Sequence, residues 1–207
     1  GLGHLSPSRT LGTLSLGEAR RLEIVAWISQ VRRGQTVLLD EPGMGLHGRE
    51  RQALAGLLHE LVEQGNTVLT ADPAREFLEA AHRWLALGPE GGPGGGQIMG
   101  QGSRVELPAE DWQENPTQAD PASDFLQFQK LRCRFLNIPK LKIPLGRLVA
   151  FCGVSGSGKT TLLEGELLPR LREERDFKGK IPMGGVHVLL ERALRWSAVS
   201  TVATLAG

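Results

Sequence analysis

The sequence has little cysteine, no long apolar run and almost no net charge. Its two cysteines, Cys133 and Cys152, are too few for a disulfide framework or a four-ligand zinc site, which fits a reducing cytoplasm. No run of about eighteen apolar residues indicates a membrane span, and no secretion signal is visible. The formal charge of +1 gives no basic excess, so bulk electrostatics neither favour nor exclude a nucleic-acid partner.

The chain also lacks an initiator methionine, because it begins at Gly1, and this suggests a fragment of a longer protein. With 207 residues, of which 40% are hydrophobic, it can bury a core as one large domain or as parts of two. Composition alone therefore leaves the function open.

Glycine, in contrast, is plentiful, and the most informative glycines lie in GVSGSGKTT at residues 153–161. The spacing from Gly153 to Gly158, Lys159 and Thr160 fits the phosphate-binding pattern G-x-x-x-x-G-K-[ST]. In this pattern backbone N–H groups surround phosphate oxygens, the lysine contacts the β- and γ-phosphates, and the hydroxyl ligates Mg²⁺. The motif predicts nucleotide binding.

The surroundings of this loop agree with the motif. An apolar strand is expected over residues 147–151 and an amphipathic helix after the loop, so that the helix N-terminus faces the phosphates. The alternative is a glycine-rich turn whose lysine is only solvated. The predicted nucleotide-binding residues of the loop are Gly153, Ser155, Gly156, Ser157, Gly158, Lys159, Thr160 and Thr161.

A second candidate is the acidic pair Asp40-Glu41, which ends the apolar run at residues 36–42. A buried parallel strand delivers such carboxylates to its C-terminal edge, an arrangement that suits a phosphohydrolase. In this interpretation Asp40 ligates Mg²⁺, directly or through water, and Glu41 activates the attacking water, so both are candidate catalytic residues. The alternative is a solvated strand end.

Ahead of the acidic pair, LSLGE opens a helix that is expected over residues 14–28. Its N-terminus would offer the Ser15 hydroxyl and the backbone at Gly17 to a phosphate, because helix N-termini attract anions. The alternative is an ordinary N-cap with Glu18 in the capping-box position.

The remaining pattern alternates strands and helices. A helix closed by Gly65 precedes the strand NTVLTA, a short helix is expected over residues 75–82, and a glycine-rich turn follows. Residues 103–124 are polar and proline-bearing, which indicates a linker or an exposed loop, and two or three strands then lead to the phosphate loop. The apolar VHVLL in the tail stops mid-element.

Together these stretches resemble a known family. LSLGE resembles the LSGGE signature of ATP-binding-cassette (ABC) ATPases, and VLLDEP with GLH resembles their Walker B motif and D-loop. The stretches TLSLGEARR, LLDEPGMGLH, GNTV, LGPEGGPGGGQI and GVSGSGKTTLLEGELLPRL are similar to the UvrA family, the excinuclease component that senses DNA damage in nucleotide excision repair. The similarity covers roughly residues 1–102 and 131–177.

The resemblance implies an α/β fold, a P-loop NTPase of the ABC type, with parts of two nucleotide-binding domains. Residues 1–102 would be the C-terminal part of a first cassette, 103–130 a linker, and 131–207 the N-terminal part of a second. The family arrangement would let Lys159 and Ser15 share one nucleotide. Asp40 and Glu41 would then serve a phosphate loop upstream of Gly1, so the chain alone is expected to be inactive.

The resemblance further implies ATP and Mg²⁺ as cofactors, DNA and excision-repair subunits as partners, a homodimer of the intact protein, and a cytoplasmic location. Three departures from the family put hydrolysis in doubt. Leu16 replaces the first signature glycine, Asp72-Pro73 replaces a Glu-His pair whose histidine contacts the γ-phosphate, and Glu191 falls near a family glutamine. DNA contact cannot be assigned to any residue.

Two functions follow as competing hypotheses. The first is a UvrA-like DNA-damage-recognition ATPase, of which this chain is an internal fragment. The alternative is a degenerate UvrA-like paralogue that binds ATP as a scaffold or interaction module with little hydrolysis. A transporter or translation-factor cassette is disfavoured, because LGPEGGPGGGQI does not resemble those groups.

Overall fold

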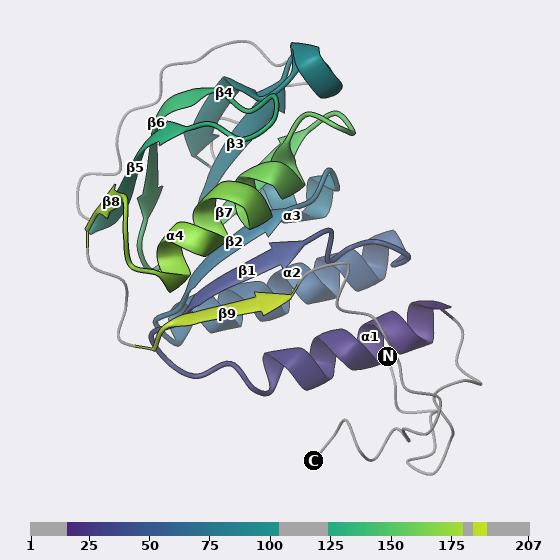
Figure 1. The fold of residues 1–207 in the computed structure, drawn as a ribbon. Coiled ribbons are helices and arrows are strands. Elements are labelled where there is room, and N and C mark those ends of the chain that lie inside the picture. The colour runs from purple at the N-terminus through teal and green to yellow at the C-terminus, as the bar shows by residue number, and fades with distance from the viewer. Residues whose placement is uncertain (1–15, 104–123, 180–183, 190–207) are drawn as a thin grey trace, which may run out of the picture.

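The computed structural model describes residues 16–103, 124–179 and 184–189 (Figure 1). The first segment contains α1 (Leu16–Ile28), β1 (Thr36–Asp40), α2 (Gly48–Glu63), β2 (Thr67–Ala71), α3 (Arg75–Ala80), β3 (Arg83–Gly88), η2 (Gly92–Gly94) and β4 (Gln97–Ser103). The rest contains β5 (Phe125–Leu131), β6 (Ile138–Pro144), β7 (Leu148–Gly153), η4 (Thr161–Leu167), α4 (Leu168–Arg172), β8 (Phe177–Lys178) and β9 (Val186–Leu189). This is the predicted α/β fold. Over these residues every helix falls short of the length and apolar character that a membrane span requires.

One six-stranded sheet unites the two segments, in the order β4-β3-β7-β2-β1-β9. β7 pairs in parallel with β3 on one side and with β2 on the other. β9 pairs in parallel with β1, whereas β4 runs antiparallel to β3. Residues 148–152 of β7 are buried throughout, as expected of a strand that has parallel neighbours on both edges. The carboxyl ends of β7 and β1 therefore lie at the same edge of the sheet, separated by β2.

That the phosphate loop and the acidic pair serve separate sites stays a prediction, although both lie at the ends of strands of this one sheet. The division of the chain into parts of two cassettes stays a prediction, but in the structure both parts supply strands to a single sheet. The last residues of the range 103–130 also form β5 rather than linker, because Leu126 and Phe128 alternate toward the core. In the tail, residues 186–189 of the apolar stretch form β9, which pairs with β1.

Layers on both faces of the sheet provide the core (Figure 1). On one face Ile24 of α1, Leu58 of α2 and Phe77 of α3 are buried in a cluster with residues of β1, β2 and β7. On the other face a second sheet, ordered β6-β5-β8, packs together with the helix that follows the phosphate loop. Phe128 and Leu162 are fully buried in this second cluster. Both faces of the central strands are thus covered, which explains their continuous apolar runs.

The helix after the phosphate loop is found as predicted, with one irregularity. Its first part, η4, is π-helical over Thr161–Leu167, and the N–H of Leu168 donates to the oxygen of Leu163. The α-helical part, α4, begins at Leu168, and its next residue, Pro169, has no N–H with which to make an α-helical bond to Gly165.

Candidate nucleotide-binding site

The phosphate loop, residues 153–160, follows β7 directly and turns on glycines. Gly153, Gly156 and Gly158 have φ angles of 131°, 76° and 104°. At Gly153 a Cβ would lie 2.0 Å from the backbone oxygen of Leu87 in β3, so only glycine fits this approach. Helical bonding starts within the loop, where the N–H of Leu162 donates to the oxygen of Gly158 at 2.7 Å. The N-terminus of the following helix thus faces the loop, as an anion site requires.

Lys159 is folded back into its own loop. Its side chain is buried, and Nζ donates to the oxygens of Gly153 and Val154 at 2.9 and 3.0 Å. Burial lowers the pKa of this lysine, and the negative charges of Glu41 and Asp40 counter part of that effect. A cation is therefore held inside the loop, bonded to carbonyls that phosphate oxygens could replace.

Thr160 joins the phosphate loop to the acidic strand. Its Oγ1 donates to the carboxylate of Asp40, whose two oxygens lie 3.1 and 3.0 Å away. Asp40 is only 1% exposed, so this carboxylate faces the loop and not the solvent. The sequence predicts both residues as Mg²⁺ ligands, and the structure brings their oxygens together. Such oxygens are the ligands that Mg²⁺ prefers.

Glu41, the predicted water-activating residue, has an unusual backbone conformation. Its φ is 45°, in the left-handed region that few non-glycine residues adopt. The N–H of Glu41 donates to the oxygen of Ala71 at 2.8 Å, which ties this residue to the end of β2. Strain of this kind persists only where the surroundings hold it, and it gathers at functional sites.

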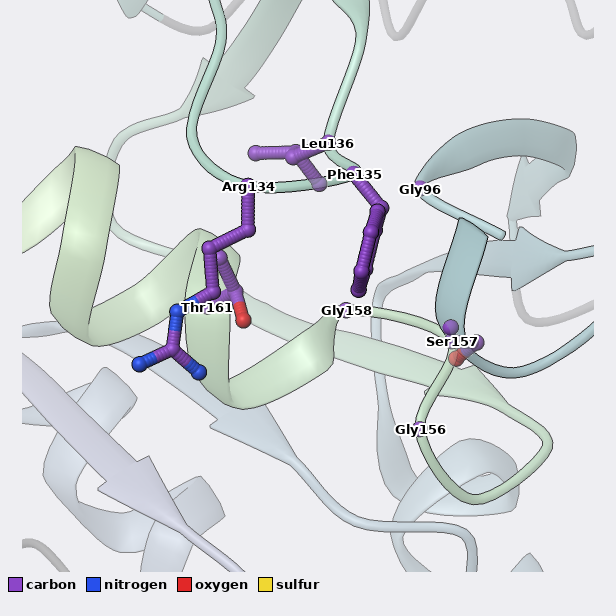
Figure 2. Close-up of a pocket in the computed structure, with 9 residues that line it drawn as sticks. Gly96, Arg134, Phe135, Leu136, Gly156, Ser157, Gly158 and Thr161 are labelled. Atoms are coloured by element: carbon purple, nitrogen blue, oxygen red, sulfur yellow. The ribbon is translucent and has the colours of Figure 1, made fainter. Parts of the chain in front are cut away.

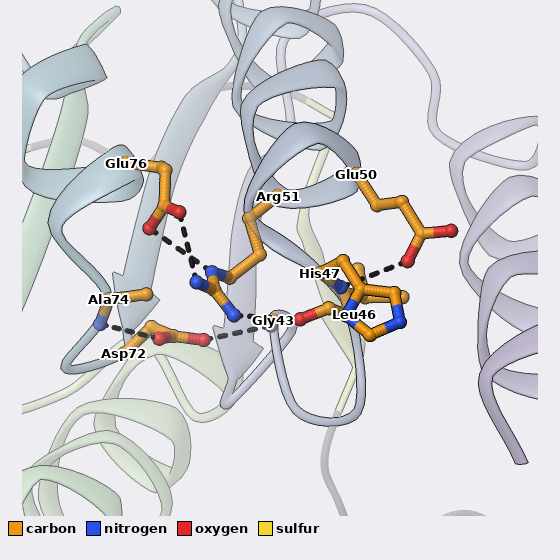
Figure 3. A network of polar contacts seen from close by, with 8 residues as sticks. All are labelled: Gly43, Leu46, His47, Glu50, Arg51, Asp72, Ala74 and Glu76. Carbon is orange, nitrogen blue, oxygen red and sulfur yellow. Dashed lines mark hydrogen bonds and ion pairs between the residues drawn. The ribbon is translucent and has the colours of Figure 1, made fainter.

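A buried carboxylate, Asp72, lies among the residues that hold the backbone conformation at Glu41 (Figure 3). Its Oδ2 accepts from the N–H of Gly43 at 2.8 Å, and its Oδ1 accepts from the N–H of Ala74 at 2.8 Å. Burial raises the pKa of Asp72, while these two N–H donors counter part of the effect. We call residues 41–46 the acidic turn. Asp72, which follows β2, holds this turn in place through its hydrogen bond with Gly43.

Arg51 of α2 provides a second attachment for the acidic turn. Its Nη1 donates to the oxygen of Leu46 at 2.7 Å (Figure 3). The same guanidinium donates to both oxygens of Glu76 in α3, over 3.1 and 3.0 Å. Because Asp72 and Glu76 both follow β2, this segment fixes the acidic turn directly at Gly43 and through Arg51 at Leu46.

The glycine-rich run, residues 91–96, lies against the phosphate loop. The N–H of Gly92 donates to the oxygen of Gly156 at 3.1 Å, and the N–H of Gly96 donates to the oxygen of Ser157 at 3.0 Å. The oxygen of Gly96 in turn accepts from the N–H of Asn137 at 2.8 Å. The run thereby connects the loop with the turn between β5 and β6. Sequence analysis predicted a glycine-rich turn here and missed this contact.

A pocket opens where these three backbone segments meet (Figure 2). Phe135 is 53% exposed, and Figure 2 shows its ring standing beside Gly158. The Ser157 hydroxyl is buried and has no hydrogen-bond partner among the described residues. Sequence analysis missed Arg134, Phe135 and Leu136, for which the only signal was an aromatic residue shortly before the loop. The pocket is lined by Gly92, Gly96, Arg134, Phe135, Leu136, Gly156, Ser157, Gly158 and Thr161.

The other predicted positions are spread more widely. Ser155 lies exposed in the phosphate loop, and Gly17 lies in the first turn of α1. Ser15 and Glu191 lie outside the described residues, so their predicted roles stay predictions. Pro73, which the sequence resemblance predicts to replace a histidine, is exposed beside the buried Asp72. The structure thus brings together the loop and the acidic pair.

Comparison with known proteins identifies relatives of this chain. No protein-family model matches the chain. UvrABC system protein A of Chlamydia pneumoniae is 31% identical over 189 residues, covering 83% of this chain and 10% of that protein. The protein of the same name from Haemophilus ducreyi is 36% identical over 183 residues, covering 82% of this chain and 19% of that protein.

A solved structure is also similar. The crystal structure of UvrA2 from Deinococcus radiodurans matches with 27% identity and a TM-score of 0.45, covering 87% of this chain and 24% of that chain. The chain thus spans between about a tenth and a fifth of the length of the two sequence relatives. Over the stretch that it covers, the chain is therefore homologous to part of the UvrA family proteins.

Proposed function

We propose that this chain is an ABC-type P-loop ATPase unit that binds ATP with Mg²⁺ and hydrolyses it in a UvrA-like DNA-damage-recognition protein. The observation that carries this proposal is the contact between Thr160 and Asp40, which joins the phosphate loop to the acidic strand. The sequence predicts an inactive chain because it assigns these residues to different sites. Their shared sheet supports one site that both segments build.

The residues present fit this ligand. Left-handed glycines shape the loop backbone, the buried Ser157 hydroxyl has no hydrogen-bond partner among the described residues, and Lys159 brings a cation. Thr160 and Asp40 would hold Mg²⁺, which when bound neutralises charge on phosphate oxygens. Lys159 would exchange its carbonyl partners for phosphate oxygens. Glu41 would orient the attacking water and accept its proton.

Replacing Lys159 with alanine is expected to weaken ATP binding by about 10- to 100-fold, since a hydrogen bond from a charged group contributes about 1.5–3 kcal/mol. Titration calorimetry with ATP and Mg²⁺ measures this. Burial lowers the pKa of Lys159, because the buried charge is disfavoured in the free folded chain, and alanine removes this charge. The variant should therefore melt no earlier than the parent. Unchanged ATP affinity would place nucleotide binding elsewhere.

Replacing Phe135 with alanine is expected to weaken ATP binding by about 5- to 100-fold, because stacking of a base on an aromatic ring contributes about 1–3 kcal/mol. Its 53% exposure and its place in the pocket beside the loop motivate this prediction. Phe135→Tyr should keep the affinity of the parent. Val25→Ala, at an apolar side chain on α1 that is 49% exposed, is the matched control. A loss common to both alanine variants would contradict the assignment.

The wider role of the protein is proposed by relationship to proteins named UvrABC system protein A. DNA and the other excision-repair subunits would be its partners, the intact protein would form a homodimer, and its location would be cytoplasmic. Because the chain covers a minor part of those relatives, these assignments concern the longer protein in which such a segment operates.

The second candidate, a degenerate paralogue that binds ATP with little hydrolysis, is favoured by one observation. Pro73 occupies the position where the family has its γ-phosphate histidine, and a proline can neither donate nor relay a proton. Phosphate release by the parent chain separates the two candidates. Turnover that depends on Glu41 supports the ATPase, whereas ATP binding without such turnover supports the scaffold.

A further inference from the structure

The second sheet turns one face to the core and the other to solvent. Register pairs Gln127 with Lys142 and Gln129 with Lys140, while Lys178 of β8 stands opposite Gln127 on the other side. Directly opposed residues share a face, and the alternating residues Leu126, Phe128, Leu141 and Ile143 are buried. The outer face therefore consists of Phe125, Gln127, Gln129, Lys140, Lys142 and Lys178, and we call it the basic sheet face.

Apart from Lys178, the residues of this face belong to a stretch from which acidic residues are missing. Residues 125–163 contain no Asp or Glu, although the charges of the whole chain nearly cancel at +1. Carboxylates lie on both sides of this stretch. Asp124 precedes β5, Asp176 lies 3.8 Å from Arg175, and the buried Glu166 pairs with Arg170 at 2.6 Å. The cations of the stretch are Lys130, Arg132, Arg134, Lys140, Lys142, Arg147 and Lys159.

The lysines of the face are not engaged with carboxylates of the described residues. Lys140, Lys142 and Lys178 are exposed and form no ion pair with any residue that the structure describes. The Nζ of Lys142 lies 4.5 Å from the centroid of the Phe125 ring, and this ring is 43% exposed. The face thus combines uncompensated positive charge with an accessible aromatic ring and two amides.

We propose that the basic sheet face binds single-stranded nucleic acid, with lysines on the phosphates and Phe125 and the glutamine amides against the bases. Charge complementarity selects a polyanion, because phosphate neutralisation by lysine drives such binding. The ring and the amides select nucleic acid over an anionic membrane, since bases stack and hydrogen-bond whereas a membrane surface favours several inserted apolar side chains. The site goes beyond the ATP site proposed above and uses none of its residues.

The test is fluorescence anisotropy of a labelled oligothymidylate with the full 207-residue chain across a salt series. Each lysine–phosphate contact on a single strand contributes about 0.7 to the slope of log K against log salt, so Lys140→Ala/Lys142→Ala should lower the slope by about 1.4. The same relation predicts a loss in affinity of about 25-fold at 0.1 M salt. Arg32→Ala/Arg75→Ala removes equal charge from exposed positions outside this sheet and should change the affinity much less.

Several results would overturn the proposal. Equal losses in the two double variants would show that only net charge matters. Displacement of the oligonucleotide by saturating ATP with Mg²⁺ would place it in the phosphate loop. Binding of the parent to phosphatidylserine vesicles but not to the oligonucleotide would favour a membrane. The variant Lys140→Gln/Lys142→Gln removes the same charges with longer side chains, and its melting temperature, compared with that of the parent, shows whether it is folded. ATP titrations in parallel test the ATP site independently.

Discussion

Replacing Gly153 with alanine is expected to destabilise the chain by about 2–5 kcal/mol and to remove ATP binding. Two separate penalties add up to this: about 1–2 kcal/mol for an L side chain at left-handed φ, and about 1–3 kcal/mol for overpacking. The overpacking arises because a Cβ at Gly153 would lie 2.0 Å from the oxygen of Leu87. Leu87 cannot withdraw easily, since β3 pairs with β4 on one side and with β7 on the other. Urea unfolding and ATP titration measure the two effects.

Gly65→Ala is the matched control for this experiment. Gly65 has a φ of 87°, but a Cβ there would meet nothing within 4 Å. This variant should therefore show only the conformational penalty of about 1–2 kcal/mol. The difference between the two variants measures how closely the phosphate loop approaches β3. Equal destabilisation would contradict the insertion of β7 beside β3, and with it the single site that we propose both segments build.

That insertion is the part of the fold that sequence could not predict. The strand, loop and helix around Lys159 are set by neighbouring residues, as is the acidic end of β1, so local pattern suffices for them. The partners of β7 are not local. Val68 and Leu148 pair although they lie far apart in the chain. Wholly apolar parallel strands resemble one another in sequence, so their sequences do not specify which strands pair. Pairing order therefore depended on the packing of the complete chain.

The pocket was missed for a related reason. Phe135 becomes relevant only because the turn between β5 and β6 approaches the phosphate loop across Gly96. A Cβ at Gly96 would lie 2.2 Å from the oxygen of Phe135, so backbone meets backbone there. Sequence patterns report which glycines permit unusual conformations, but they do not report which segment fills the space that a missing side chain leaves.

The largest catalytic effect is expected from Glu41→Gln, which should lower kcat by about 100- to 10,000-fold, the usual contribution of a positioned general base. ATP binding should persist, because the phosphate loop and the pair of Thr160 and Asp40 remain. Phosphate release under saturating ATP and Mg²⁺ measures kcat, and calorimetry measures binding. A parent that binds ATP yet releases phosphate no faster than this variant would support the scaffold candidate.

The variant Asp72→Asn tests whether the hydrogen bonds that Asp72 makes affect catalysis by positioning Glu41. Burial raises the pKa of Asp72, so at neutral pH, above its usual range, its negative charge destabilises the folded chain, and the neutral amide should fold well. An asparagine can accept from only one of the N–H groups of Gly43 and Ala74, because its Nδ2 is a donor. Losing one buried bond of this kind costs about 1–3 kcal/mol, and the acidic turn should shift.

We expect Asp72→Asn to lower kcat by about 10-fold or more without a matching change in ATP affinity, since a small displacement of a positioned group is costly to rate. In the Glu41→Gln background the same substitution should lower kcat no further, because the carboxylate that Asp72 is proposed to position is already absent. Multiplying losses would show instead that Asp72 acts independently of Glu41. Arg51→Met removes the attachment at Leu46 and should follow the same pattern, lowering kcat only while Glu41 is present.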